Sequence, residues 1–246
     1  MMMYYDTYGN ENKPAIVFLH GANFVHTFGR QYGLSDAYYL LVPHIMGYGK
    51  AADSVFDAEA ASAELVRFIC SMGRKVTLIG FSLGAQLAVK MIAEHAELLS
   101  GAIVVSPWLI KNEPELSVAL EMGKKQLRTL KNKGMCNLIG LMNGLPKQQR
   151  KEFISQMQAV QMETVENTVY NNIALKTVTS FQNADIPIMA LAGAKEQKSV
   201  IDSVKTLGRM NRRCRIEIWD KAAHNIPPVY AKRFIACIHA FMADES

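Results

Sequence analysis

The fold class is indicated most directly by the segment Val76-Thr-Leu-Ile-Gly-Phe-Ser-Leu-Gly-Ala85. Its first four residues are apolar or β-branched, as in a buried strand, and the residues from Ala85 onward have helical apolar spacing. The segment Gly80-Phe-Ser-Leu-Gly84 is therefore expected to be a sharp turn between a strand and a helix. A serine on such a turn has a strained backbone and needs small neighbours, which the two glycines supply. The pattern predicts that Ser82 is a nucleophile.

Short apolar runs of the same kind recur on both sides of this turn, with amphipathic helical patterns between them. This alternation is typical of a parallel sheet that helices cover on both faces. We therefore predict an α/β fold with a mostly parallel sheet of six or seven strands. The other strands are expected at Ala15–Leu19, Tyr38–Val42, Ala102–Val105, Pro187–Leu191 and Arg215–Trp219, with an edge strand over Met2–Tyr8 paired through a turn at Gly9-Asn10. Helices are expected at Phe56–Met72, Ala85–Leu99, Ser199–Met210 and Pro228–Met242.

The strand and helix rhythm stops between residues 108 and 180, which indicate three or four amphipathic helices and no convincing strand. We interpret this segment as a helical cap inserted into a core formed by residues 1–107 and 181–246. Breaks between its helices are expected at Gly134, at Gly144-Leu-Pro146 and near Glu163-Thr164. Methionine side chains are adaptable and suit a pocket lining, although packing within the cap would explain each of them as well. The cap carries Met122, Met135, Met142, Met157 and Met162.

Composition excludes several classes of protein. With 246 residues, 50% of them hydrophobic and 20% charged, the chain can bury a substantial core without disulfides. Its four cysteines lie far apart and have no CxxC spacing, so we interpret them as reduced thiols. No apolar run reaches the roughly 20 residues that a membrane span needs, and we expect a cytoplasmic protein with no metal or organic cofactor.

The formal net charge of +5 raises the question of a nucleic-acid partner. The basic residues are densest at 124–133 and 147–151, at helical spacing and without interleaved aromatic residues. We interpret both groups as solvated helix faces and expect no nucleic-acid partner.

A serine hydroxyl needs a base within hydrogen-bond reach, and the chain has six histidines. His224 follows the last predicted strand, at the sheet edge where open α/β sheets bind their ligands. His95 and His239 lie within predicted helices and His26 lies in a loop. His44 belongs to a turn that precedes the serine. We therefore expect His224 to be the base.

Four elements in this order make the chain resemble the α/β-hydrolase family across nearly its whole length outside the cap. They are His20-Gly21, Gly47-Tyr48-Gly49, Gly80–Gly84 and His224-Asn-Ile-Pro-Pro228. The resemblance implies a catalytic triad in the chain order nucleophile, acid, histidine, with the acid after the strand that follows the cap.

The residue in the position of the triad acid is Glu196, three positions after Gly193, where relatives usually carry Asp. A glutamate can hold the imidazole tautomer and stabilise its charge as an aspartate does. Asp220, four residues before the histidine, and Asp202 remain alternatives.

The resemblance further implies an oxyanion hole made by the backbone N–H groups of Leu83 and Ala22. Asn23, which follows Ala22, and Phe81, which precedes Ser82, are expected to contact substrate. His20 is expected to support the loop. His44 stands where relatives commonly carry Asp, so it is either a neutral structural residue or a modifier of polarity at the mouth of the site.

The first hypothesis for function is hydrolysis of a small ester or related acyl compound through an acyl-enzyme on Ser82. A small-molecule acyl substrate is then the expected partner. The same triad also serves carbon–carbon bond cleavage, lyase chemistry and perhydrolysis in this fold. Some members act instead as ligand receptors with slow turnover. Haloalkane dehalogenase chemistry is disfavoured, because those relatives carry a carboxylate nucleophile in place of the serine.

Overall fold

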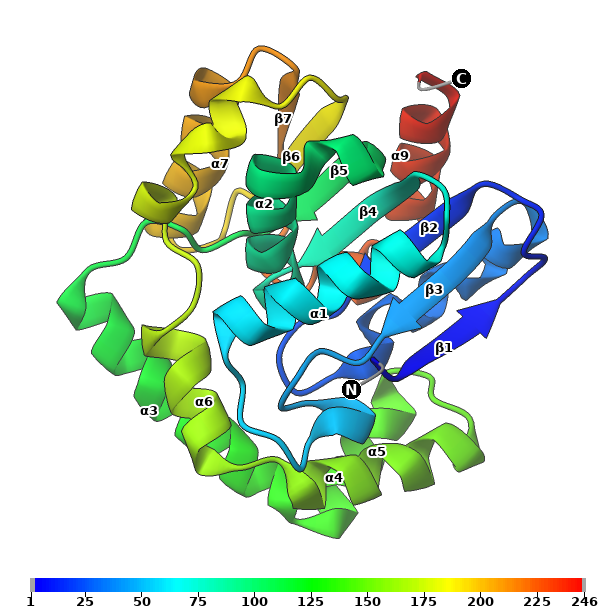
Figure 1. Cartoon of the computed structure of the whole chain (residues 1–246). Coiled ribbons are helices and arrows are strands. Elements are labelled where there is room, and N and C mark those ends of the chain that lie inside the picture. Colours follow the sequence, from blue (N-terminus) through cyan, green and yellow to red (C-terminus); the bar gives the residue numbers. More distant parts are fainter. Residues whose placement is uncertain (1–2, 245–246) are drawn as a thin grey trace.

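The computed structural model describes residues 3–244, which form a seven-stranded sheet with helices on both faces (Figure 1). The strand order is β1-β3-β2-β4-β5-β6-β7, and every neighbouring pair is parallel except β1 with β3. The predicted α/β fold with a mostly parallel sheet is confirmed. The strands are β1 (Tyr5–Tyr8), β2 (Ala15–Leu19), β3 (Tyr39–Pro43), β4 (Val76–Phe81), β5 (Leu99–Val105), β6 (Ile188–Gly193) and β7 (Cys214–Trp219).

The edge strand β1 differs from the prediction in its pairing. It runs antiparallel to β3, with Tyr5 opposite Pro43, and does not pair with β2 across the turn at Gly9-Asn10. Both edges of β2 are already occupied, by β3 on one side and β4 on the other, so the chain before the turn adds to the outer edge of β3. Met2, included in the predicted strand, lies outside the described residues.

The two faces of the sheet bury alternate residues of each strand. In β2, Val17 and Leu19 belong to the core cluster shared with α1, α2 and α7, whereas Ile16 and Phe18 belong to the cluster shared with η1 and α9. The predicted final helix is interrupted at Tyr230, which separates α8 from α9. Helical elements outside residues 108–180 include η1 (Val25–Asp36, a 3-10 segment), α1 (Ala58–Ser71), α2 (Leu83–His95), α7 (Lys198–Met210), α8 (Ile226–Val229) and α9 (Ala231–Asp244).

Between β5 and β6 the chain forms four α-helices, and residues 108–180, all of them described, contain no strand. Figure 1 places these helices together beneath the carboxyl ends of the parallel strands. Among residues 3–244, no helix combines the length and apolarity needed to cross a lipid bilayer. The four helices are α3 (Glu113–Lys131), α4 (Lys133–Met142), α5 (Lys147–Ala159) and α6 (Met162–Tyr170).

All three predicted breaks between these helices are present, but two of them come two or three residues before the predicted positions. Gly134 lies inside α4, and the break comes at Asn132, whose side-chain Oδ1 accepts the N–H of Met135 at 3.0 Å as a helix N-cap. Thr164 lies inside α6, where its hydroxyl accepts the N–H of Phe56 at 3.2 Å. The break predicted at Gly144-Leu-Pro146 is present, between α4 and α5.

Candidate active site

Ser82 stands on a strained turn between β4 and α2. Its φ of 53° and ψ of −111° lie outside the regions that side chains favour. A Cβ on Gly84 would lie 2.1 Å from the carbonyl oxygen of Leu19, and one on Gly80 would lie 2.4 Å from the carbonyl oxygen of Gly84. The two glycines therefore allow the chain segments around the serine to approach closely.

A continuous series of hydrogen bonds links Ser82, His224 and Glu196. Nε2 of His224 lies 3.1 Å from Oγ of Ser82, and Nδ1 of His224 lies 2.7 Å from Oε2 of Glu196. The imidazole side chain is 48% exposed whereas the glutamate side chain is 1% exposed. The ring of Phe81 packs against the imidazole, with ring centroids 4.9 Å apart. The structure thus brings together three residues that are distant in sequence.

The buried carboxylate of Glu196 accepts two further hydrogen bonds through Oε1. The hydroxyl of Ser106 donates at 2.7 Å and the backbone N–H of Gly193 donates at 2.8 Å. Burial by itself would raise the pKa of the Glu196 carboxyl, but the hydrogen bonds from His224, Gly193 and Ser106 hold that pKa below its ordinary value. The site therefore favours an ionised glutamate.

Ser106 did not figure in the sequence analysis. It is fully buried at the end of β5 and has a φ of 57°, in the left-handed region. A signal was available, because a polar residue directly after a buried parallel strand lies at the ligand-binding edge of the sheet. The sequence does not show, however, that Ser106 lies within hydrogen-bond distance of the loop after β6.

The two alternative acids lie elsewhere. Asp220 is an exposed residue after β7, and Asp202 forms an ion pair with Lys198 within α7. The carboxylate that contacts the imidazole of His224 is that of Glu196.

The other histidines have different partners. Nδ1 of His26 lies 3.0 Å from the hydroxyl of Tyr32, and Nδ1 of His239 lies 3.2 Å from the hydroxyl of Tyr38. His95 lies 3.5 Å from a carboxylate oxygen of Glu97.

His20 shapes the loop that faces the serine. Burial lowers its pKa to about 3, so the ring is uncharged. Nε2 accepts the N–H of Ile45 at 3.1 Å, and Nδ1–H therefore donates to the carbonyl oxygen of Gly21 at 2.7 Å. In a trans peptide the N–H points opposite to the carbonyl, so the N–H of Ala22 is directed away from His20. A Cβ on Gly21 would lie 3.7 Å from Cβ of Ser82, which places this loop beside the serine.

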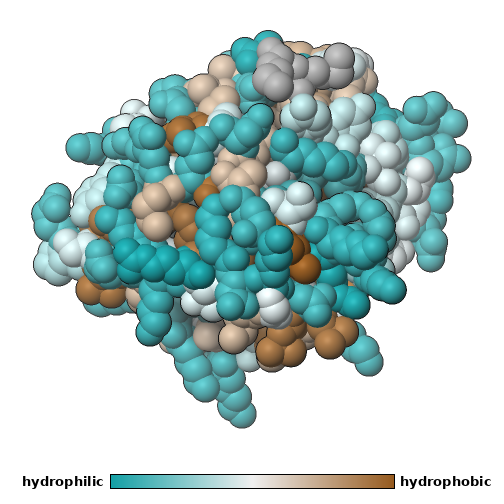
Figure 2. Space-filling model, turned by 90° about the horizontal axis from the view of Figure 1, so that it is seen from below, coloured by the Kyte–Doolittle hydropathy of each residue, from teal (hydrophilic) through white to brown (hydrophobic). Residues whose placement is uncertain are grey.

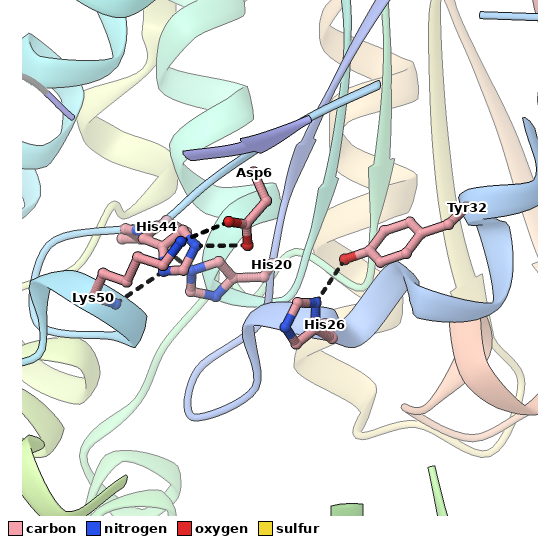
Figure 3. A network of polar contacts seen from close by, with 7 residues as sticks. Asp6, His20, His26, Tyr32, His44 and Lys50 are labelled. Carbon is pink, nitrogen blue, oxygen red and sulfur yellow. Dashed lines mark hydrogen bonds and ion pairs between the residues drawn. The ribbon is translucent and has the colours of Figure 1, made fainter. Parts of the chain in front are cut away.

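His44 belongs to a separate polar network that joins β1 to the Gly47-Tyr48-Gly49 turn (Figure 3). Its Nδ1 accepts the backbone N–H of Lys50 at 2.9 Å, so Nε2–H donates to Oδ2 of Asp6 at 3.0 Å. Nζ of Lys50 donates to Oδ1 of Asp6 at 2.7 Å. A Cβ on Gly49 would lie 2.2 Å from Nδ1 of His44, so the turn needs glycine there. His44 is 1% exposed and serves as a structural residue.

A cavity of about 530 Å³ is lined by sequence neighbours of the serine and the histidine, although Ser82 and His224 themselves do not line it. Ala22, Asn23 and Phe81 line it, as does Asn225, the neighbour of the histidine in sequence. Oδ1 of Asn23 is buried and has no hydrogen-bond partner among the described residues. A larger cavity, of about 880 Å³, includes none of these groups, and is lined by residues 57–59, 109–111, 113, 116, 170–177, 179 and 210.

The methionines between β5 and β6 have different environments. Met122 lines the 530 Å³ cavity, and Met157 is buried among apolar residues. Met162 is partly buried against the same core, whereas Met135 and Met142 are exposed. Packing thus accounts for part of this set and the cavity for one member.

No group of three or more His, Cys, Asp or Glu residues within residues 3–244 is arranged to hold a metal ion. All four cysteines are free thiols.

Comparisons with known proteins agree with this architecture. A sequence profile of the alpha/beta hydrolase family matches residues 16–236. A search of curated proteins found no significant match. Similar solved structures include MenH from S. aureus, with 18% identity, a TM-score of 0.76 and 99% of each chain covered. They also include a thermophilic esterase from Thermogutta terrifontis, with 16% identity and a TM-score of 0.73 over 99% of this chain and 93% of that one.

A third similar structure is the enol-lactonase from Burkholderia xenovorans LB400, with 13% identity and a TM-score of 0.77 over 98% of this chain and 96% of that one. At such identities, the likeness establishes a shared fold.

Proposed function

Because the chain belongs to the alpha/beta hydrolase family, we propose that it is a serine hydrolase that cleaves a small ester or related acyl compound. The observation that carries this proposal is the hydrogen-bonded series from Oγ of Ser82 through His224 to Glu196, with distances of 3.1 Å and 2.7 Å. A hydroxyl, an imidazole and a buried carboxylate in this order are the groups that nucleophilic acyl transfer needs.

In this mechanism Oγ of Ser82 attacks the acyl carbon, and Nε2 of His224 takes the hydroxyl proton. The imidazolium is stabilised by Glu196, which also keeps the hydrogen on Nδ1 in the resting state. The protonated imidazole then donates its proton to the leaving alcohol. Water, deprotonated by the same imidazole, attacks the acyl-enzyme. The acid is released as the bond to Oγ of Ser82 breaks, and the imidazolium returns its proton to Oγ, which restores the resting serine and imidazole.

We assign the stabilisation of the negative charge that develops on the acyl oxygen to the backbone N–H groups of Leu83 and Ala22. Leu83 is the first residue of α2, where N–H groups have no acceptor within the helix and carry a partial positive charge. For Ala22, support comes from the hydrogen bond between Nδ1 of His20 and the carbonyl oxygen of Gly21. This bond fixes the Gly21–Ala22 peptide before substrate arrives. Fixed donors of this kind lower a barrier by about 3 kcal/mol each.

The substrate is assigned to the 530 Å³ cavity, with Asn23 and Phe81 as contacts. A buried carbonyl oxygen without a partner is costly, and a hydrogen-bond donor on the substrate would satisfy Oδ1 of Asn23. Because Met122 and Ile139 line the same cavity, we also assign residues 108–180 to a cap over a core of residues 1–107 and 181–246.

The test begins with a fluorophosphonate probe and p-nitrophenyl esters of graded acyl length. We expect the parent chain to be labelled and to turn over short esters, and Ser82→Ala to lose both. Ser117→Ala, which changes an exposed serine on α3, is the control and is expected to keep both. Labelling of Ser82→Ala at the parent level would refute the assignment of the nucleophile, and labelling without turnover would refute ester hydrolysis as the function.

A matched pair of variants tests the acid. Glu196→Gln keeps the shape of the side chain but loses its charge, and we expect kcat to fall by about 10⁴-fold, as for other triad acids. Asp220→Asn makes the same change on the alternative acid and is expected to keep full activity. The reverse result would overturn the assignment of Glu196.

A further inference from the structure

Helix α4 is strongly apolar, yet it lies on the outside of the molecule. Of its ten residues, only Cys136 and Gly140 are buried. Its exposed apolar side chains are Met135, Leu138, Leu141 and Met142, which are 42%, 48%, 56% and 71% exposed. Figure 2, viewed from the side of α3–α6, shows hydrophobic residues exposed as brown groups among hydrophilic ones. An apolar helix normally packs against a core, so this outer face lacks a partner within the chain.

The sequence around α4 carries all of the excess positive charge of the protein. Residues 124–151 contain eight basic residues and no acidic one, whereas the rest of the chain, with 19 basic and 22 acidic residues, has a formal charge of −3. One of the eight, Lys124, pairs with Glu166 at 2.9 Å. The eight are Lys124, Lys125, Arg128, Lys131, Lys133, Lys147, Arg150 and Lys151.

The exposed helix is next to the entrance of the candidate active site. Ile139 of α4 and the following Asn143 line the 530 Å³ cavity together with Met122 and Lys125 of α3. Met122 is itself 63% exposed. One residue of α4 and one of the eight basic residues, Ile139 and Lys125, therefore line the cavity itself.

We propose that α4 docks on the surface of an anionic phospholipid bilayer. Its four exposed apolar side chains insert among the lipid headgroups, and the basic residues of 124–151 bind the phosphates around them. This combination of an apolar helix face with flanking lysine and arginine is the arrangement that binds bilayer interfaces without spanning them. Charges alone are explained by solvated helix faces, but the exposed apolar side chains between them are not. The proposal concerns binding and does not require hydrolysis.

The first experiment measures co-sedimentation of the chain with vesicles of phosphatidylcholine alone or with phosphatidylglycerol added. The Ser82→Ala chain is used, so that the lipid is not consumed and a failure of the proposed function leaves the result intact. We expect binding only to vesicles that contain phosphatidylglycerol, and weaker binding as salt rises. The double variant Leu138→Ser/Met142→Ser is expected to abolish binding, whereas Ile216→Ser, at a 42% exposed position on β7, is the control.

The second experiment separates a local basic surface from net charge. In Arg128→Gln/Lys133→Gln/Lys147→Gln, three charges are removed beside α4, and the control Lys75→Gln/Lys205→Gln/Arg212→Gln removes three exposed charges elsewhere. A basic residue near an anionic surface is worth about a five-fold change in partitioning, so we expect a loss of about 100-fold for the first triple and little change for the control. Equal losses in the two triples would overturn the proposal.

A third measurement reports insertion directly. Tryptophan introduced as Leu138→Trp is expected to shift its fluorescence to shorter wavelength on phosphatidylglycerol vesicles, because its ring leaves water. Absence of that shift would overturn the proposal. A different pair of results would also overturn it: the parent chain does not bind vesicles, and it forms a dimer that Leu138→Ser/Met142→Ser dissociates. In that case α4 would contact a second copy of the chain.

Discussion

Replacing Ser106 with alanine or with glycine separates the effect of its hydroxyl from the effect of its backbone conformation. The hydroxyl donates to Oε1 of Glu196 at 2.7 Å in a fully buried site, and the residue has a φ of 57°. Both variants lose the hydrogen bond. Only glycine also relieves the left-handed conformation, because it has no Cβ.

The magnitudes follow from these two contributions. A hydrogen bond to a charged group contributes about 2 kcal/mol, so we expect Ser106→Ala to lower the free energy of unfolding by about that amount. The relief of backbone strain returns about 1 kcal/mol in Ser106→Gly. If at least half of the hydrogen-bond energy positions Glu196 in the transition state, kcat/KM falls by about 5-fold or more in both variants. Ser106 is in this view a positioning residue that acts through Glu196.

Urea denaturation measures the stabilities, and hydrolysis of a p-nitrophenyl ester across the pH range measures the activities. Because the hydrogen bond from Ser106 helps to keep the pKa of Glu196 low, we expect the pKa of that carboxyl to rise in both variants, as an NMR titration of the carboxyl would measure. Ser199→Ala is the control, since that buried hydroxyl has no partner among the described residues. If the activity of Ser106→Gly matched the parent at every pH, the positioning role would be refuted.

Two further predictions concern stability. Gly84→Ala places a Cβ 2.1 Å from the carbonyl oxygen of Leu19, so we expect the free energy of unfolding to fall by about 3 kcal/mol in a urea titration. Gly33→Ala is the control, because a Cβ there meets no atom within 4 Å, and it should leave the free energy of unfolding unchanged. The hydrogen bond from His44 holds the pKa of Asp6 well below its ordinary value. Burial opposes this effect, and the hydrogen bond from Lys50 adds to it. Its folded-state pKa is thus depressed, so Asp6 stabilises the fold above the unfolded pKa of about 3.9 and loses this effect as pH falls further. Asp6→Asn should therefore be less stable than the parent by about 2 kcal/mol at neutral pH, and a gap that stayed constant in unfolding experiments down to pH of about 2 would contradict this explanation.

The elements of the sheet could be predicted from the sequence because their signals are local. A buried parallel strand is apolar on both faces, so Ala15–Leu19 is visible as a run of five such residues and has the same bounds in the structure. The turn at Ser82 is equally local, since Gly80 and Gly84 stand within two residues of it. The order of the serine, acid and histidine came with the family resemblance.

The acid illustrates the limit of local patterns. Glu196 and Asp220 both follow predicted strands at the same edge of the sheet, and the sequence left both open. In the structure the carboxylate within hydrogen-bond distance of His224 is that of Glu196, held by Gly193 and Ser106. Which side chain reaches the imidazole depends on the paths of two loops, and neither path is written in the residues next to the acid.

The α/β fold class, the strands and the sharp turn at Ser82 could thus be predicted, because each depends on residues that are neighbours along the chain. The pairing of β1 with β3, the hydrogen bond from Ser106 to Glu196 and the exposure of the apolar side chains of α4 become visible only in the folded chain. The first two of these features join segments as far as 90 residues apart. All three depend on which surfaces remain free once the sheet and its helices have packed together. The apolar periodicity of one segment does not show which other segments will cover it.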